Sequence, residues 1–235
     1  MLHSFHLARV PAAATARAMA RRPVAPGLRL AEPMAQMRLG APVVSPDRMQ
    51  LSRIAMFAAW DDEAALERFL EREPLGRRLA GGWHVRLEFV RRWGFVTEVG
   101  DLPEVASRSD PDEPAVAFTL ARMRLPEVPR FLHWGRPVER LVRDHPGTTL
   151  ALAAARPPRS IATFSIWRTA RDMTGMVFGR SSGEQTGDPR RHADAMAERE
   201  RRDFHHEFTT LRFRPLSEHG SWEGRTAIVP GAAGG

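Results

Sequence analysis

The sequence predicts an α+β fold in which ferredoxin-like repeats form a barrel of the dimeric α+β type. The second half of the chain reads as strand, helix, strand, strand, helix, strand, which is the ferredoxin-like order. A faint internal repeat also relates segments 54–94 and 161–224: each has a strand ending in Trp, an amphipathic helix and a strand ending in a Gly turn. Two such units in one chain can pair sheet against sheet into a barrel.

The first unit of the repeat begins near Gln50. Residues 54–60 are a short apolar run, typical of a buried strand. Asp61 or Asp62 can cap the helix that follows over 63–72, whose apolar side chains recur at helical spacing. Residues 83–89 alternate apolar and polar side chains after Gly81-Gly82, which predicts a half-buried strand. Residues 102–114 are acidic and rich in Pro, which predicts a long loop.

The second unit is predicted in the same way. Strand composition returns at 115–123, 148–155, 160–167 and 208–216, and helical patterns lie at 129–143 and 169–178. A last helix is expected over 188–204, because Asp188 suits the N-cap and Pro189 suits the first helical position.

These elements predict one structured domain over residues 49–228, with ferredoxin-like halves at 49–110 and 114–228. Residues 1–48 are rich in Ala, Pro and Arg and poor in acidic residues. This composition is typical of a disordered leader or of a wrongly assigned start codon, and it also resembles a transit peptide. We therefore expect residues 1–48 to lie outside the fold and residues 229–235 to form a tail.

Composition excludes several classes of chemistry. The 235 residues include no Cys, no Tyr and no Lys, so thiolate ligands, Cys nucleophiles, Tyr acid–base chemistry and Schiff bases are excluded. The net charge is +7, but residues 1–50 hold seven Arg against two acids, a net of +5, and leave only +2 for the rest. A nearly balanced domain argues against a nucleic-acid partner. We expect a cytoplasmic protein and leave peripheral membrane association open.

Motifs near the C-terminus carry a resemblance to a known family. The strand Thr163–Arg168 reads TFSIWR, Phe208 and Phe213 give F-x-x-x-x-F, and Gly220–Gly224 reads GSWEG. With a helix that carries one His between them, these motifs resemble the C-terminal signature of the spheroidene monooxygenase family, whose members oxygenate carotenoids. The resemblance covers roughly residues 54–224 and is loose outside these motifs.

The resemblance implies a haem-dependent monooxygenase that inserts oxygen into an apolar polyene, carotenoid or terpenoid-like substrate. It implies haem b as the cofactor, with His192 as the iron ligand, and O2 and a ferredoxin-type electron donor as partners. Arg168 and Ser165 are the candidate catalytic residues, which would bind iron-bound oxygen. The side chains expected to line the pocket are Phe164, Trp167, Phe208 and Phe213.

The residues themselves leave alternatives open. His192 lies in the first turns of the expected helix beside Arg190 and Arg191, where positive charge favours the neutral imidazole that metals bind. An exposed His in a charged stretch is the plainer interpretation. His205-His206-Glu207 resembles a metal cluster, but adjacent residues on a helix diverge by about 100° and do not converge on one ion easily.

The chain also departs from the family pattern. The segment after TFSIWR lacks the usual Tyr, the Trp-Tyr pair before the last strand is replaced by Asp203-Phe204, and an early strand and helix are not evident before Ile54. Two alternatives therefore stay open: a haem-dependent dehydratase or peroxidase in the same barrel type, and a non-catalytic carrier of haem or an apolar ligand. A monomer and a homodimer are equally compatible with the sequence.

Overall fold

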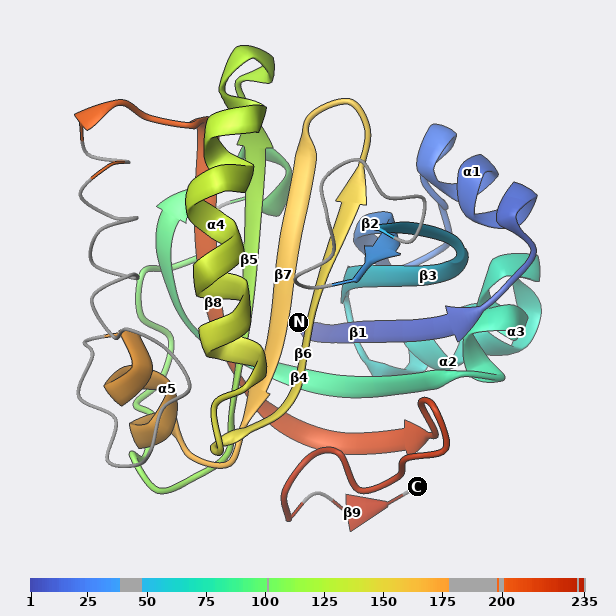
Figure 1. The fold of residues 1–235 in the computed structure, drawn as a ribbon. Helices are drawn as coiled ribbons and strands as arrows, with labels where there is room; N and C mark the ends of the chain where they lie inside the picture. The colour runs from blue at the N-terminus through green and yellow to red at the C-terminus, as the bar shows by residue number, and fades with distance from the viewer. Residues whose placement is uncertain (39–47, 101, 178–197, 199–200, 232, 235) are drawn as a thin grey trace.

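A closed antiparallel barrel forms the centre of the computed structural model. The structure describes residues 1–38, 48–100, 102–177, 198, 201–231 and 233–234. Within these residues the strand order is β4-β1-β3-β2-β6-β7-β5-β8, and β4 pairs again with β8, so that eight antiparallel strands close on themselves. The helices lie outside the barrel (Figure 1). The predicted α+β barrel of two ferredoxin-like halves is confirmed.

The first half has the strand order β4-β1-β3-β2. Its elements are β1 Leu2–Arg9, α1 Ala12–Ala20, β2 Leu28–Met37, β3 Met49–Trp60, α2 Glu63–Arg72, α3 Pro74–Ala80 and β4 Trp83–Phe95. The α2 helix begins where the sequence indicated, because the Asp62 carboxylate accepts a hydrogen bond from the Ala65 N–H at 2.8 Å.

The second half repeats this plan with the order β6-β7-β5-β8. Its elements are β5 Ala115–Met123, α4 Val128–Arg143, β6 Thr148–Arg156, β7 Ser160–Trp167, α5 Ala170–Val177 and β8 His205–Gly220. The internal repeat seen in the sequence corresponds to β3-α2-β4 and β7-α5-β8. Most of the helix expected over 188–204 lies outside the described residues.

The expectation that residues 1–48 form a leader outside the fold is wrong. Strand β1 lies between β3 and β4 and pairs with both, from Leu2↔Trp60 to Arg9↔Arg53 on one side. Strand β2 joins the first half to β6 of the second half. The early strand and helix that the sequence pattern did not reveal before Ile54 are therefore present. The first half extends back to residue 2.

The barrel interior is filled by large apolar side chains from both halves. Phe5 of β1 and Phe164 of β7 are stacked with ring centroids 3.7 Å apart, and Phe57 stacks on Phe118 at 4.2 Å. His3 lies among the rings of Phe57, Phe89 and Phe213. Interior side chains this closely packed form a core rather than a channel.

A charged cluster closes one end of the interior. The Glu32 carboxylate is fully buried and accepts hydrogen bonds from Arg22 at 2.8 Å, Arg122 at 3.1 Å and Arg156 at 2.9 Å. Arg22 and Arg122 also pair with Glu98. Charges taken out of water in this way are stable only when they are paired, so this cluster fixes the position of β2 against β5 and β6.

The opposite end is closed by the C-terminal segment. Glu218 of β8 accepts a hydrogen bond from the Trp83 indole at 2.7 Å and from the backbone N–H groups of Ile228 and Val229. The side chains of Ile228 and Val229 are buried in the interior core, and β9, Ala233–Gly234, pairs with β8. Residue 229 and the two residues of β9 therefore belong to the fold, in contrast to the predicted tail.

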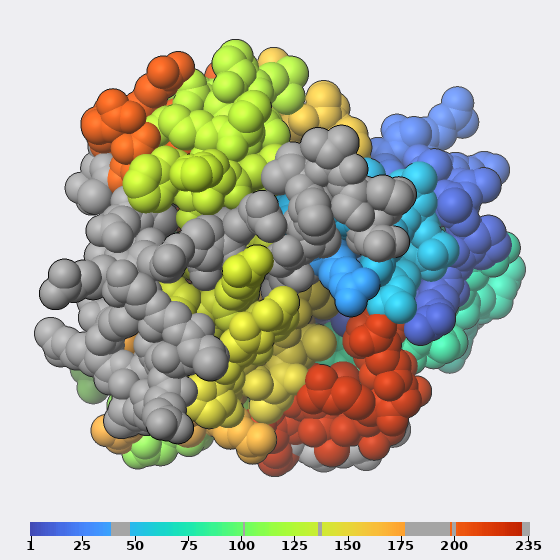
Figure 2. All heavy atoms as spheres, viewed as in Figure 1, coloured from blue at the N-terminus to red at the C-terminus, as the bar shows by residue number. Residues whose placement is uncertain are grey.

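The outer face of the first half is covered by helices. Helices α1, α2 and α3 pack against β1 and β3 through a second core that includes Met56, Trp60, Leu66, Phe69 and Leu79. In the space-filling view, N-terminal residues lie at the right, the second half at the left and the C-terminal residues at the bottom (Figure 2). None of the described helices is long and apolar enough to cross a membrane.

Candidate functional site

The outer face of the second half differs from that of the first half because its centre carries short side chains. One row of aligned residues crosses β8, β5, β7 and β6 and consists of Thr210, Thr119, Thr163 and Ala153. The hydroxyl groups of Thr119 and Thr210 lie 3.2 Å apart. Thr163 is exposed although β7 is flanked by β5 and β6. The described helices therefore leave Thr163, at the middle of this face, accessible, and we call the outer face of the second half the second-half face.

Apolar side chains flank the second-half face on two sides. Trp167 is buried at one end and packs with Ala170 and Met173 of α5. Phe208 lies at the other end, in a cluster with Met123, Phe204 and residues of α4. The face thus combines a centre of small side chains, in which Thr163 is exposed and Thr119 and Thr210 are half-buried, with apolar ends. This combination suits a flat apolar molecule.

Two predicted residues, Ser165 and Trp167, lie together on this face. They are two residues apart on β7, and the Trp167 indole N–H donates a hydrogen bond to the Ser165 hydroxyl oxygen at 2.8 Å. Arg168 follows at the end of the strand, where it is exposed and its backbone N–H donates to the Gly147 carbonyl. Phe164, the residue before Ser165, points into the barrel interior instead.

The four predicted pocket residues do not lie together. Phe164 and Phe213 point into the barrel interior and belong to its core. Trp167 and Phe208 lie on the outside, because side chains along a strand alternate between the two faces. The sheet itself separates the two pairs, so only Trp167 and Phe208 can contact a ligand on the second-half face.

The predicted iron ligand, His192, lies outside the described residues. Of the two neighbouring candidates, His206 is exposed, whereas His205 is buried among Phe131, Phe204 and Phe208. Among the described residues, no group of three or more His, Asp or Glu side chains is arranged to hold a metal ion.

Three residues on this face were not singled out from the sequence: Arg91, Trp93 and Arg212. Arg91 and Arg212 are directly opposite each other on β4 and β8, and their guanidinium carbons lie 4.4 and 5.1 Å from the centre of the Trp93 ring. Burial and then the charge of Arg91 lower the pKa of Arg212. The sequence predicted the end of the strand at Arg91–Gly94, but β4 continues to Phe95 because β8 pairs along its whole length.

A row of stacked imidazoles lies on the outside of the first half. His6 of β1, His84 of β4 and His219 of β8 are direct cross-strand neighbours with ring centroids 5.0 and 4.6 Å apart. Ser4 contacts His6 at 2.7 Å, and Ser217 contacts His219 at 3.0 Å. Burial lowers the pKa of all three, with the pKa of His84 at about 3. Because these stacked rings are neutral and buried, we interpret them as packing residues of the first half and not as a functional site.

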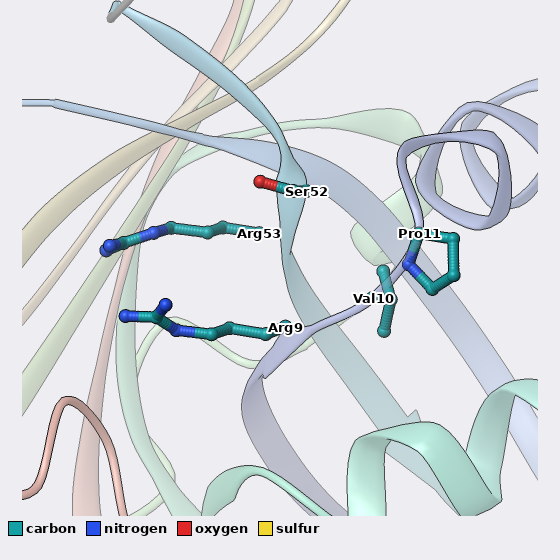
Figure 3. A pocket seen from close by; sticks show the side chains of 5 residues that line it. All are labelled: Arg9, Val10, Pro11, Ser52 and Arg53. Carbon is teal, nitrogen blue, oxygen red and sulfur yellow. The ribbon is translucent and has the colours of Figure 1, made fainter.

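A surface hollow of about 380 Å³ is also found in the first half, at the end of β1. It is lined by Arg9, Val10, Pro11, Ser52 and Arg53, and the side chains of Arg9 and Arg53 extend side by side (Figure 3). Arg53 is paired with Glu223 and lies over the Trp222 ring at 5.6 Å. Part of its charge is therefore already balanced, whereas Arg91 and Arg212 have no carboxylate partner among the described residues.

Two ferredoxin-like halves in one closed barrel define the structural class of this protein. No protein-family model matches the chain, and no curated protein matches it. The resemblance to the spheroidene monooxygenase family therefore stays an expectation from the sequence.

Several solved structures are similar at low identity. A putative monooxygenase from Fusobacterium nucleatum is 8% identical with a TM-score of 0.37, covering 92% of this chain and 93% of that one. An anthrone oxidase-like protein is 14% identical with a TM-score of 0.35, covering 96% and 95%. A heme-degrading enzyme from Listeria monocytogenes is 9% identical with a TM-score of 0.29, covering 88% and 98%. A likeness this distant carries no assignment of activity.

Proposed function

We propose that this chain is a haem-dependent monooxygenase that acts on an apolar polyene or terpenoid-like substrate at the second-half face. The observation that carries the proposal is the accessible centre of this face, where Thr119, Thr163 and Thr210 replace the large side chains of the first half. The positions of the first half that correspond to Thr119, Thr163 and Thr210 are His6, Met56 and His84, and all three of these larger side chains are buried. In the described part of the chain, the centre of the outer face is therefore more accessible in the second half than in the first half.

Three features of the described residues support haem as the ligand in this proposal. Short side chains leave space for a flat macrocycle, while Trp167 and Phe208 supply apolar contacts at its edges. Arg91 and Arg212 place positive charge beside the face, which suits a ligand with carboxylates. In this proposal His192 ligates the iron, as the sequence resemblance implies. When bound, haem supplies the activation of O2, with electrons from a ferredoxin-type donor.

Ser165 is the residue whose role the geometry supports best. Its hydroxyl oxygen accepts the hydrogen bond from Trp167, which leaves its own O–H proton to donate to a ligand on the face. Trp167 thereby holds the hydroxyl in place and is itself buried. Arg168, exposed at the strand end, would act through its charge near the mouth of the site.

The first experiment is an absorption spectrum of the protein produced with a supply of haem. The proposal expects a Soret band that disappears in His192→Ala and persists in His206→Ala. Thr163→Phe should weaken haem binding because it fills the accessible centre of the face, whereas Val24→Phe, at a position 89% exposed in the first half, should not. A protein that shows no Soret band under any of these conditions is not a haem enzyme.

Oxygen consumption separates the remaining candidates. Substrate-dependent O2 uptake with a ferredoxin-type reductant supports the monooxygenase. Turnover that needs neither O2 nor reductant indicates a dehydratase, turnover that requires a peroxide indicates a peroxidase, and stable haem binding without turnover indicates a carrier.

A further inference from the structure

We propose that Arg91, Arg212 and Trp93 form a binding site for the carboxylate of a planar, conjugated ligand. The three side chains share the second-half face, at its edge formed by β4 and β8. The site rests on the proposed function only where the carboxylate is that of a haem propionate. Binding of another carboxylate does not require haem.

The two arginines lie where the described residues provide no carboxylate to compensate their charge. They are directly opposite each other in an antiparallel pair, and like charges in such positions destabilise a sheet. Both guanidinium groups lie against the same ring, that of Trp93. A cation over an aromatic face is weakly stabilised, but two cations on one ring still repel each other. An anion between them would remove this repulsion.

Neighbouring arginines show how the chain pairs its other charges. Arg214, two residues after Arg212, is paired with Glu88 at 2.7 Å and Glu113 at 3.4 Å. Arg92 donates to the backbone carbonyls of Leu102 and Gly94. Among the described residues, neither Arg91 nor Arg212 has a carboxylate partner.

One buried donor of each guanidinium group is also unused among the described residues. The Nε atoms of Arg91 and Arg212 are buried without a hydrogen-bond partner in the described part of the chain. Buried donors without partners are costly, and they are often satisfied by a ligand. The planar guanidinium fork matches the two oxygens of a carboxylate, which makes a carboxylate the expected anion.

The surroundings indicate that the rest of the ligand is planar and apolar. Trp93 is 39% exposed and Phe95, on the same face of β4, is 46% exposed, although both are large aromatic residues. Phe208 lies opposite Phe95 on β8. Accessible aromatic side chains beside two adjacent cations provide a surface on which the conjugated part of a ligand can stack.

The test uses 2-naphthoate as the probe and 2-naphthylmethanol as its uncharged counterpart, with binding measured by calorimetry. We expect the carboxylate to bind at least about tenfold more tightly than the alcohol, since a charge-assisted contact contributes about that factor. Arg212→Gln and Arg91→Gln should each weaken 2-naphthoate binding about tenfold. Arg214→Gln is the matched control, because it removes the same charge from the same strand and should change binding less than about twofold.

Two results would overturn the proposal. One is equal binding, or no binding, of the carboxylate and the alcohol to the unmodified protein. The other is an equal loss of 2-naphthoate affinity in Arg212→Gln and Arg214→Gln. Thermal unfolding of each variant shows whether it is folded, and a misfolded single variant is replaced by Arg212→Lys, which keeps the charge and loses the fork.

The source of the natural carboxylate is decided by two further measurements. If the pair holds haem propionates, haem should displace 2-naphthoate, and haem dimethyl ester should bind more weakly than haem. If it holds a substrate carboxylate, the haem-loaded protein should bind 2-naphthoate as well as the haem-free protein does. A protein that binds 2-naphthoate but never haem retains this site and contradicts the haem proposal.

Discussion

Phe5 of β1 and Phe164 of β7 stack face to face inside the barrel, with ring centroids 3.7 Å apart and planes 3° from parallel. The two residues lie 159 positions apart, one in each ferredoxin-like half. Phe5 also contacts Phe118 and Phe164 contacts Trp83, so the stack joins strands of both halves. The interior of the barrel is thus one shared core, and neither half is expected to be stable alone.

The first prediction concerns this shared core. Phe5→Ala should lower the free energy of unfolding by about 3–5 kcal/mol, because it removes a fully buried ring and leaves a cavity. Val24→Ala provides the control at an exposed position and should change stability by less than about 0.5 kcal/mol. Chemical denaturation of the two variants checks the prediction, and equal stabilities would contradict the placement of β1 in the barrel.

The same placement makes residues 1–37 indispensable. Their removal would expose β3 and β4 along the edges that β1 occupies, and it would uncover the interior core. A chain lacking these residues should therefore lack a cooperative unfolding transition. A leader could be removed without this effect.

The sequence predicted the second half well because its strands alternate clearly and its turns carry Gly and Pro. Strands 115–123 and 160–167 have the bounds that the pattern indicated. The N-terminal elements of the first half were missed because β1 is buried on both faces, so His3, Ser4 and His6 are buried although they are polar. The basic composition of residues 1–48 was also misleading, since Arg22 and Arg48 are paired with Glu32 and Glu139.

Only part of the candidate site could be predicted from the sequence. Ser165 and Trp167 could be placed on one face from the period of the strand. The separation of Phe164 from Trp167 follows from the same period, but the choice of inner or outer face depends on the closure of the sheet. The pair Arg91 and Arg212 could not be found, because the β4–β8 register joins segments 121 residues apart and includes a bulge next to Arg91.

A second prediction concerns the buried carboxylate of Glu32. Glu32→Ala should destabilise the protein by about 3–5 kcal/mol, because it leaves Arg122 and Arg156 partly buried without their shared partner. Arg171→Ala is the control, since the ion pair between Arg171 and Asp112 is 68% and 71% exposed and should contribute less than about 1 kcal/mol. Urea unfolding at neutral pH measures both. A small effect of Glu32→Ala would indicate that water reaches this end of the barrel.

A third prediction concerns the pH dependence of stability. Burial lowers the pKa of His3 from its ordinary value of 6.5 to about 4. Because the unfolded chain binds this proton more readily, the stabilisation is complete above about pH 6.5 and is lost as the pH falls toward the folded pKa. At about pH 4.5 the loss of unfolding free energy from His3 alone should be about 2.5 kcal/mol. The lowered pKa of His6 and of His84 adds to it in the same direction.

The contribution of His3 can be isolated by substitution. His3→Leu removes the titrating group from among Phe57, Phe89 and Phe213, and it should reduce the loss of stability between neutral and acidic pH. His133→Leu, at an exposed position on α4, is the control and should leave the pH profile unchanged. Unfolding free energies measured across this pH range test both variants. Identical pH profiles for the two variants would contradict the assignment of the acid destabilisation to His3.

A fourth prediction concerns Gly220, the first glycine of the GSWEG motif. Gly220 and Gly224 both have a positive φ, of 76° and 75°. A Cβ at Gly220 would lie 2.0 Å from the Gly82 carbonyl oxygen, whereas a Cβ at Gly224 would have no neighbour within 4 Å. Alanine at either position costs about 1–2 kcal/mol for its backbone conformation. Only Gly220→Ala should cost a further 1–3 kcal/mol or so, because β4 and β8 must move apart. Equal thermal unfolding of the two variants would show that the motif glycine is needed for its turn and not for the close pairing that seals the barrel.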